Sequence, residues 1–183
     1  MTDKKKLLLH SCCGPCSTSV LESLREEYET TVFFYNPNIT DGEEYEKRLT
    51  AQKQVCREEE SVAGVCPLVL GNYDPERYIE ACAGLEDEPE GGSRCTVCFR
   101  LRLEETARKA KELGFEVFGT TLSVSPHKNY KLLSVLGQEI ARAYGLEFLD
   151  RDFKKKNGYG RSVELSKAYG LYRQNYCGCD FAR

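Results

Sequence analysis

The chain has 183 residues, of which 40% are hydrophobic and 30% are charged, and its formal net charge is −3. This length is enough for one domain with a real core. The slightly acidic balance excludes a strongly basic surface, so any contact with nucleic acid must come from a local patch. No apolar run approaches the roughly 20 residues that a membrane helix needs, and Leu7-Leu8-Leu9 is too short for the core of a signal peptide. We therefore expect a cytoplasmic protein.

Strand and helix patterns alternate from the start of the chain. An apolar run over 7–11 predicts a buried strand, and apolar residues at helical spacing predict a helix over 17–28. A β-branched and aromatic strand at 31–35 precedes a polar helix over 41–61, with Asp41 as its N-cap. A third strand at 67–70 precedes a helix that begins at Asp74-Pro75, where the aspartate caps and the proline occupies the first turn.

The second half continues the alternation after a break at 86–92. We expect a helix at 99–113, a strand at 116–121, a helix at 130–144, a strand at 146–149, a basic loop at 152–161 and a last helix at 162–169. This order predicts a single doubly wound, mostly parallel α/β sheet, Rossmann-like and of about five strands, with helices on both faces. We expect one domain over residues 1–183, with 74–102 as an excursion that carries the Cys95/Cys98 pair.

Cysteines are unusually numerous, and seven of the ten lie in three tight groups. These groups are Cys12-Cys13-Gly14-Pro15-Cys16, Cys95-x-x-Cys98 and Cys177-Gly178-Cys179. Clustered thiols in a reducing compartment indicate metal binding or redox exchange. A mostly thiolate site favours zinc or iron–sulfur, and with only two histidines a histidine-rich site is excluded. We interpret the isolated Cys56, Cys66 and Cys82 as core-filling thiols.

The first two groups supply enough thiols for a 4Fe–4S cluster. The turn at Cys12 and Cys13 follows the first strand, where doubly wound sheets bind ligands. Cys95 and Cys98 share one face at a helix start, where the helix dipole favours thiolates. We expect these four residues to hold the cluster, since such clusters accept varied spacings. A thioredoxin-like dithiol and a four-thiolate zinc site are the alternatives. Cys16 is then surplus, either a ligand of a second metal or an inert thiol.

Cys177 and Cys179 form either an exchangeable redox pair or ligands of an auxiliary iron. A disulfide across a single glycine is strained and easily reduced. An unstructured tail with incidental cysteines is the alternative.

A basic loop with a tyrosine follows the fifth predicted strand. Its cations are Lys154, Lys155, Lys156 and Arg161, and together with Arg173, Arg94, Arg100 and Arg102 they could form a rim that binds phosphate. An ordinary solvated loop explains the same charges. Neither a Walker loop nor a dinucleotide glycine fingerprint follows the first strand, so nothing indicates ATP, NAD or flavin.

Five segments, in order along nearly the whole chain, resemble the epoxyqueuosine reductases of the QueH type. They are Leu-His-Ser-Cys-Cys-Gly-Pro-Cys from Leu9, Phe-Phe-Tyr-Asn-Pro-Asn-Ile from Phe33, Arg-Cys-x-x-Cys-Phe-x-x-Arg-Leu from Arg94, Thr-Thr-Leu-x-x-Ser-Pro-x-Lys from Thr120 and Tyr-Arg-Gln-x-Tyr-Cys-Gly-Cys from Tyr172. The resemblance implies reduction of epoxyqueuosine, at the wobble position of tRNA, to queuosine. This deoxygenation takes two electrons and two protons and releases water. The resemblance also implies iron–sulfur chemistry in place of cobalamin, which requires an electron-donor protein as a partner.

Roles for further residues follow from this implied reaction. Asp180 and Tyr176 are candidates for supplying protons to the leaving oxygen, and a metal acting as a Lewis acid is the competing mechanism. The basic loop would hold the anticodon stem-loop. An iron–sulfur tRNA sulfurtransferase would need an ATP-binding Ser-Gly-Gly-type loop where this chain has Cys12-Cys13-Gly14. A non-catalytic, zinc-stabilised tRNA-binding domain is the third possibility.

Overall fold

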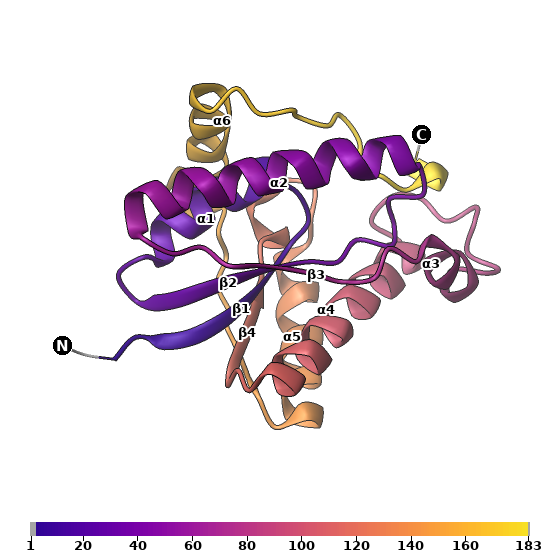
Figure 1. Cartoon of the computed structure of the whole chain (residues 1–183). Coiled ribbons are helices and arrows are strands. Elements are labelled where there is room, and N and C mark those ends of the chain that lie inside the picture. The colour runs from indigo at the N-terminus through magenta and orange to yellow at the C-terminus, as the bar shows by residue number, and fades with distance from the viewer. Residues whose placement is uncertain (1–2, 183) are drawn as a thin grey trace.

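Five parallel strands form one sheet in the order β3-β2-β1-β4-β5 (Figure 1). The strands are β1 (Lys5–Ser11), β2 (Tyr28–Phe34), β3 (Leu68–Leu70), β4 (Val117–Thr120) and β5 (Glu147–Phe148). The structure is a computed structural model and describes residues 3–182. Every strand pairing is parallel, which confirms the predicted doubly wound sheet.

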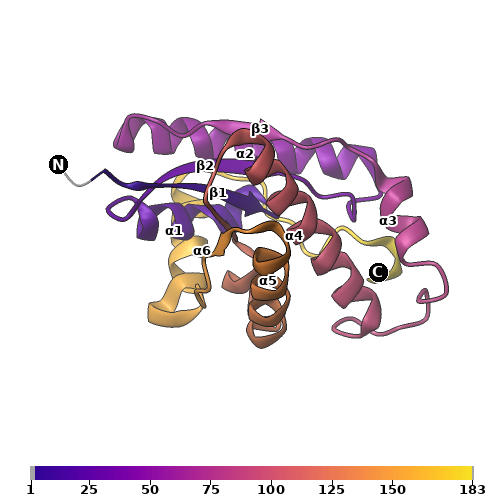
Figure 2. The same ribbon diagram turned by 90° about the horizontal axis from the view of Figure 1, so that it is seen from below.

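Helices cover both faces of this sheet. The α-helices are α1 (Gly14–Leu24), α2 (Gly42–Ala63), α3 (Pro75–Ala81), α4 (Ser93–Leu113), α5 (Tyr130–Tyr144) and α6 (Gly158–Ala168). Short 3₁₀ turns are η1 (Leu122–Val124), η2 (Lys155–Asn157) and η3 (Asp180–Ala182). Figure 1 shows α1, α2 and α6 above the sheet, and Figure 2, seen from below, shows α4 and α5 on the opposite face. No helix within residues 3–182 combines the length and the apolar character that crossing a bilayer requires.

The hydrophobic core is split between the two faces by the alternation of β1. Leu7 and Leu9 pack against α1 and α2, whereas Leu8 packs against α4 and α5. All three side chains are 0% exposed, and each fully buried leucine contributes roughly 1.5–3 kcal/mol. A continuous apolar run is typical of a central parallel strand, because both faces are covered.

The switch point of the sheet lies between β1 and β4. From β1 the chain first builds outward through β2 and β3, and then returns to the other side of β1 to add β4 and β5. Cys12 therefore follows one strand at the switch point and Thr121 follows the other. This is the position at which open α/β sheets leave a crevice for ligands.

Several predicted helix ends are confirmed by their capping contacts. The Asp41 side chain accepts hydrogen bonds from the backbone N–H groups of Glu43 and Glu44, and the Asp74 side chain accepts one from Arg77. These contacts satisfy N–H groups that a helix start would otherwise leave unpaired.

Three helices begin earlier than predicted. Helix α1 starts at Gly14 because the Cys13 side chain acts as its cap and Pro15 is tolerated in a first turn. Helix α4 starts at Ser93, which places Cys95 and Cys98 well inside its first turns. Helix α6 starts at Gly158, so the second half of the predicted basic loop is helical. A Cβ at Gly158 would lie 1.8 Å from the carbonyl oxygen of Phe153, so only glycine allows this tight entry.

Candidate active site

The first thiol group lies in the turn between β1 and α1. The sulfur atoms of Cys12, Cys13 and Cys16 all lie within 4.8 Å of one another, and the Cys12 and Cys13 sulfurs are 3.9 Å apart. The structure thus brings Cys16, surplus in the sequence, beside the adjacent pair. Within residues 3–182 this is the one group of cysteine, histidine or acidic side chains close enough to hold a metal ion.

Local contacts fix the shape of this turn. The Cys13 sulfur accepts a hydrogen bond from the backbone N–H of Cys16 at 3.4 Å. The backbone N–H of Cys12 donates to Thr121 Oγ1 at 3.3 Å, which ties the turn to the end of β4. A Cβ at Gly14 would lie 2.8 Å from the carbonyl carbon of Ala51. Glycine therefore lets the turn approach the α2 backbone closely.

The three sulfur atoms perturb one another's ionisation. Hydrogen bonds from Cys13 and Cys16 hold the pKa of Cys12 well below its ordinary value. Hydrogen bonding to Cys12 in turn raises the pKa of Cys13 to about 12, and the pKa of Cys16 is raised for the same reason. The three-cysteine group thus favours ionisation of one thiol and opposes ionisation of a second. A bound cation removes that opposition, because metal ligation favours deprotonated thiols.

The second thiol group lies at the start of α4 and is not part of the group formed by Cys12, Cys13 and Cys16. Cys95 and Cys98 line a small cavity with Cys177 and Cys179 of the chain end. Cys82 is fully buried beside Cys98 and Cys179 in the same apolar cluster. The excursion predicted at 74–102 and the C-terminal pair therefore meet here. All ten cysteines, which lie within the described residues, are free thiols, so the Cys177 and Cys179 sulfurs form no disulfide.

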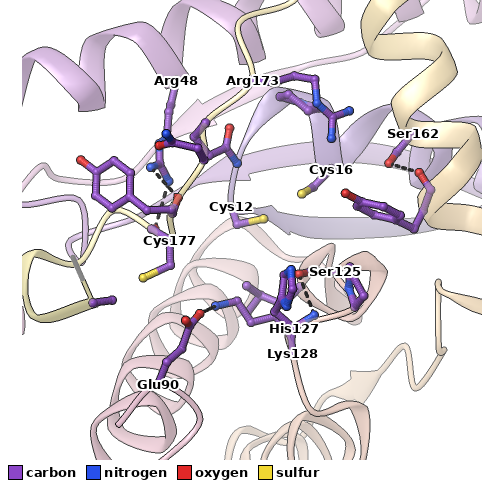
Figure 3. A pocket seen from close by; sticks show the side chains of 18 of the residues that line it. Cys12, Cys16, Arg48, Glu90, Ser125, His127, Lys128, Ser162, Arg173 and Cys177 are labelled. Atoms are coloured by element: carbon purple, nitrogen blue, oxygen red, sulfur yellow. Dashed lines mark hydrogen bonds and ion pairs between the residues drawn. The ribbon is translucent and has the colours of Figure 1, made fainter. Parts of the chain in front are cut away.

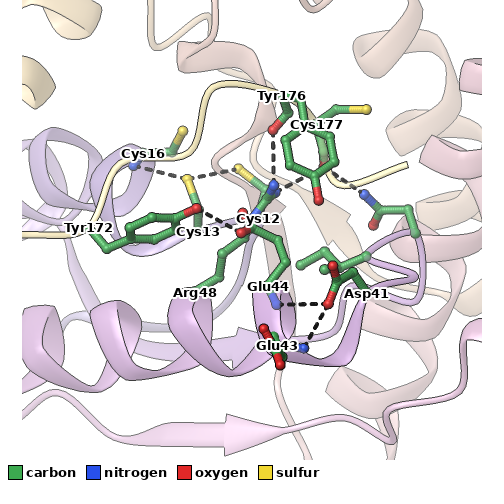
Figure 4. A network of polar contacts seen from close by, with 12 residues as sticks. Cys12, Cys13, Cys16, Asp41, Glu43, Glu44, Arg48, Tyr172, Tyr176 and Cys177 are labelled. Atoms are coloured by element: carbon green, nitrogen blue, oxygen red, sulfur yellow. Dashed lines mark hydrogen bonds and ion pairs between the residues drawn. The ribbon is translucent and has the colours of Figure 1, made fainter. Parts of the chain in front are cut away.

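The C-terminal pair is held by a buried arginine from α2. Arg48 donates to the backbone carbonyls of Tyr176 and Cys177, each at 3.0 Å (Figure 4). Its Nε donates to Glu44 at 2.7 Å, and the opposite carboxylate oxygen accepts a hydrogen bond from the Tyr172 hydroxyl. The segment before Cys177 is consequently anchored to the core, so it does not form the unstructured tail that was the alternative.

The two C-terminal thiols differ in their surroundings. Hydrogen bonds from Cys177 and from the Tyr78 hydroxyl, 2.8 Å away, lower the pKa of Cys179 to about 6, with Arg94 adding a favourable charge. The hydrogen bond with Cys179 and burial raise the pKa of Cys177. Such a pair has one thiolate and one protonated partner near neutral pH, which is the state that supports thiol exchange or ligation.

A cavity of about 400 Å³ opens over the first thiol group (Figure 3). Cys12 and Cys16 line it together with Cys177, so the C-terminal pair faces both cavities. Its other lining residues are mostly cationic, amide or aromatic: Arg48, Arg102, His127, Lys128, Arg173, Gln174, Asn175, Tyr159 and Tyr176. Glu90 is the acidic residue among the side chains that line it. The volume falls in the range of about 300–1,000 Å³ usual for small-molecule sites.

The predicted substrate-binding cations are spread over different environments. Arg173 lines the cavity. The Lys154 side chain is held within the protein, because its Nζ donates hydrogen bonds to the backbone carbonyls of Ser123 and Lys128. Lys155 and Lys156 are exposed at η2, and Arg161 forms ion pairs with Glu22 and Glu164.

The two predicted proton donors also differ in position. Tyr176 lines the large cavity, whereas Asp180 is exposed in η3 and is not among the side chains that line either cavity.

Two cationic residues of the site, Arg48 and Lys128, were not singled out from the sequence, and Arg102 was predicted only as part of a phosphate-binding rim. Arg48 and Arg102 are buried and Lys128 is nearly so, and charged residues are so seldom buried that composition gave no reason to place them inside. Arg102 and Lys128 do occur in the segments quoted above for the family resemblance, which is the signal that would have found them.

Fold and site together define a doubly wound α/β protein with a thiol-rich centre, able to hold a metal, at the switch point of its sheet. The donor set fits a soft metal, because sulfur atoms converge there and buried arginines lie beside them. The sequence profile of the family described as "Epoxyqueuosine reductase QueH" matches residues 7–183. The chain belongs to this family.

Individual relatives agree with the family match. A protein of Streptococcus pyogenes named "Epoxyqueuosine reductase QueH" is 44% identical over 180 residues, which cover 98% of this chain and 71% of the relative. A relative of the same name from Staphylococcus epidermidis is 41% identical, with 98% and 77% covered. One from Thermotoga maritima is 37% identical, with 96% and 89% covered.

Proposed function

We propose that this chain reduces the epoxide of epoxyqueuosine in tRNA to the alkene of queuosine. The observation that carries the proposal is the three-thiol group of Cys12, Cys13 and Cys16 at the base of a cavity of about 400 Å³, in a chain that belongs to the epoxyqueuosine reductase family. Both carbon–oxygen bonds of the epoxide break and a carbon–carbon double bond remains. The reaction consumes two electrons and two protons, and the epoxide oxygen is released as water.

The metal centre is part of this proposal. We assign Cys12, Cys13, Cys95 and Cys98 to a 4Fe–4S cluster and Cys16 to the same centre or to an additional iron. Support comes from the shared surroundings of these residues, since Arg102, Lys128 and Cys177 line both cavities. When bound, the cluster would supply the electrons for the reduction.

The chain's own residues would orient the substrate and supply protons. Cys177 lines both cavities, whereas Cys179 lines only the small one. We assign Cys177 and Cys179 to a redox-active pair or to the additional iron. Tyr176 lines the large cavity with Arg48 above its ring at 5.2 Å. We therefore place Tyr176 before Asp180 as the proton donor to the leaving oxygen.

The tRNA would approach over the open side of the large cavity. Arg173 lines that cavity and is exposed, and Lys155 and Lys156 are exposed at η2 beside α6. We assign these three cations to phosphate contacts and Tyr159, which is 43% exposed and also lines the cavity, to stacking on a base. Lys154 and Arg161 would support this surface through their contacts within the protein.

The remaining parts of the proposal concern the protein as a whole. An electron-donor protein is a required partner, because the reaction consumes two electrons. We further propose that the chain acts in the cytoplasm as one α/β domain, with residues 74–102 as an excursion that delivers Cys95 and Cys98.

Anaerobic reconstitution with iron and sulfide tests both the reaction and the centre. The loaded full chain, given a chemical reductant and tRNA carrying epoxyqueuosine, should be brown and should convert the nucleoside to queuosine. Cys13→Ala should fail to build the full cluster, whereas the control Cys66→Ala should build it, because Cys66 packs on the core and lines neither cavity. A colourless zinc protein without turnover would contradict the proposed function.

A further inference from the structure

Arg102 is a buried cation placed between the two thiol groups. It is 3% exposed and lines both the large cavity over Cys12 and the smaller cavity that contains Cys98 and Cys177. It lies on α4 one turn after Cys98, so both side chains share a helix face. The guanidinium therefore faces thiols from all three cysteine segments of the chain.

No carboxylate within the described residues 3–182 forms an ion pair with Arg102. Its contacts include a long hydrogen bond to Asn36 Oδ1 at 3.5 Å, the ring of Phe99 at 5.8 Å and a hydrogen bond with the Cys98 side chain. Its Nε has no hydrogen-bond partner in this part of the chain. Burying a cation without a counter-charge costs several kcal/mol, so the compensating negative charge must come from sulfur.

The other cationic side chains that line the small cavity have polar partners of their own. Arg94 is buried and pairs with no carboxylate in residues 3–182, but its guanidinium donates to the backbone carbonyls of Leu85, Glu86 and Glu88. Lys128 also lines both cavities, but it pairs with Glu90 at 3.9 Å. Arg102 is thus the cation that lines both cavities and has no carboxylate partner within the described residues.

We propose that Arg102 is the fixed counter-charge of the metal–thiolate centre and that it raises the reduction potential of that centre. This inference rests on the proposed function. Reduction adds one electron from the donor, so the reduced centre carries one more negative charge than the oxidised centre. A buried cation stabilises the more negative state, since electrostatic interactions are strong in a low-dielectric interior. Arg102 is therefore a positioning residue, because its charge affects the reaction only through the metal–thiolate centre.

The test is a redox titration of the anaerobically reconstituted full chain, followed by its visible absorption. In Arg102→Gln and Arg102→Met, the equilibrium constant for reduction should fall at least about tenfold, which is about 59 mV for a one-electron couple. Arg102→Lys, which keeps the charge, should stay within about twofold of the wild type on the same scale. Arg100→Gln is the matched control, because Arg100 on the same helix is exposed and pairs with Glu139.

Asn36→Asp provides a variant that keeps the arginine. It places a carboxylate beside the guanidinium, so it should lower the potential in the same direction even if the neutral variants do not fold. An unchanged potential in folded, iron-loaded Arg102→Gln or Arg102→Met would overturn the inference, as would an unchanged potential in Asn36→Asp. Those results would not contradict epoxide reduction by the wild type. A wild type that takes up no iron and reduces no epoxide would instead overturn the proposed function.

Discussion

Arg48 in α2 donates a hydrogen bond from Nη1 to the backbone carbonyl of Cys177, 129 residues further along the chain, at 3.0 Å. The same guanidinium forms a buried ion pair with Glu44, in which the two side chains are 2% and 7% exposed. A helix near the start of the sequence thereby sets where the C-terminal thiol pair lies.

Replacing Arg48 with methionine should destabilise the protein and release the C-terminal thiols. The Glu44 carboxylate would be buried without its cation, which costs about 3–5 kcal/mol. Urea denaturation measures the loss, and alkylation of Cys177 and Cys179 in the metal-free protein should become at least several-fold faster. Arg57→Met on the exposed side of α2 is the control. Unchanged alkylation would mean that Arg48 does not hold this segment.

The contribution of Glu44 to stability should depend on pH. Although burial opposes ionisation, hydrogen bonds from Tyr172 and Arg48 outweigh it and lower the pKa of Glu44. A carboxyl with a lowered folded-state pKa stabilises the protein above its unfolded pKa of about 4.3 and loses that contribution as the pH falls. Glu44→Gln should therefore be less stable than the wild type at pH 7, with the gap closing toward pH 3.

Denaturation at several pH values checks this expectation. Glu60→Gln, on the exposed face of the same helix, should differ from the wild type by less than about 0.5 kcal/mol at every pH. A gap for Glu44→Gln that widens on acidification would contradict the assigned role.

Gly14→Ala should disturb the thiol turn. Its Cβ would lie 2.8 Å and 2.9 Å from the backbone carbonyl atoms of Ala51, which cannot rotate away. Overpacking of this kind costs typically about 1–3 kcal/mol, and the shift would move Cys13 and Cys16. We expect lower stability by calorimetry and at least several-fold less iron bound. Gly42→Ala is the matched control, since nothing lies within 4 Å of its added Cβ. Equal stability and iron content in the two variants would refute the packing argument.

Cys16→Ala should weaken metal retention even though four other cysteines form the assigned cluster. Its sulfur lies within 4.8 Å of both Cys12 and Cys13, so its removal takes away a potential ligand and a neighbouring hydrogen-bond donor. Iron and sulfide content after dialysis against a chelator measures the effect, and Cys66→Ala provides the comparison. If Cys16→Ala retains as much iron as Cys66→Ala, then Cys16 is an inert neighbour of the centre.

Charge reversal should have different effects at the three lysines of the basic loop. Lys155→Glu and Lys156→Glu should each weaken tRNA binding and reduce the slope of affinity against salt by about one, because exposed phosphate contacts release counterions. Lys154→Glu should instead lower stability, since Lys154 donates to two backbone carbonyls. Filter binding at several salt concentrations, with exposed Lys53→Glu as the control, tests this. Equal binding by Lys155→Glu, Lys156→Glu and the control would remove η2 from the interface.

Most of the fold was predictable, because local patterns specify it. The apolar run of β1, the caps Asp41 and Asp74 and the alternation of strands with helices each depend on residues close together in the chain. The position of Cys12 at the switch point followed from the same alternation. The early start of α1 was missed, since a cysteine side chain performs the capping that serine or aspartate usually provides.

By itself, the sequence determined a doubly wound, mostly parallel α/β sheet, a thiol turn at its switch point and three cysteine segments available for one centre. Only the tertiary structure decided that Cys16 joins Cys12 and Cys13, that Arg48 anchors Cys177, and that Arg102 lies uncompensated between the thiol groups. The physical reason is that hydrophobic period and capping act over a few residues, whereas the burial of a charge depends on which distant segments enclose it.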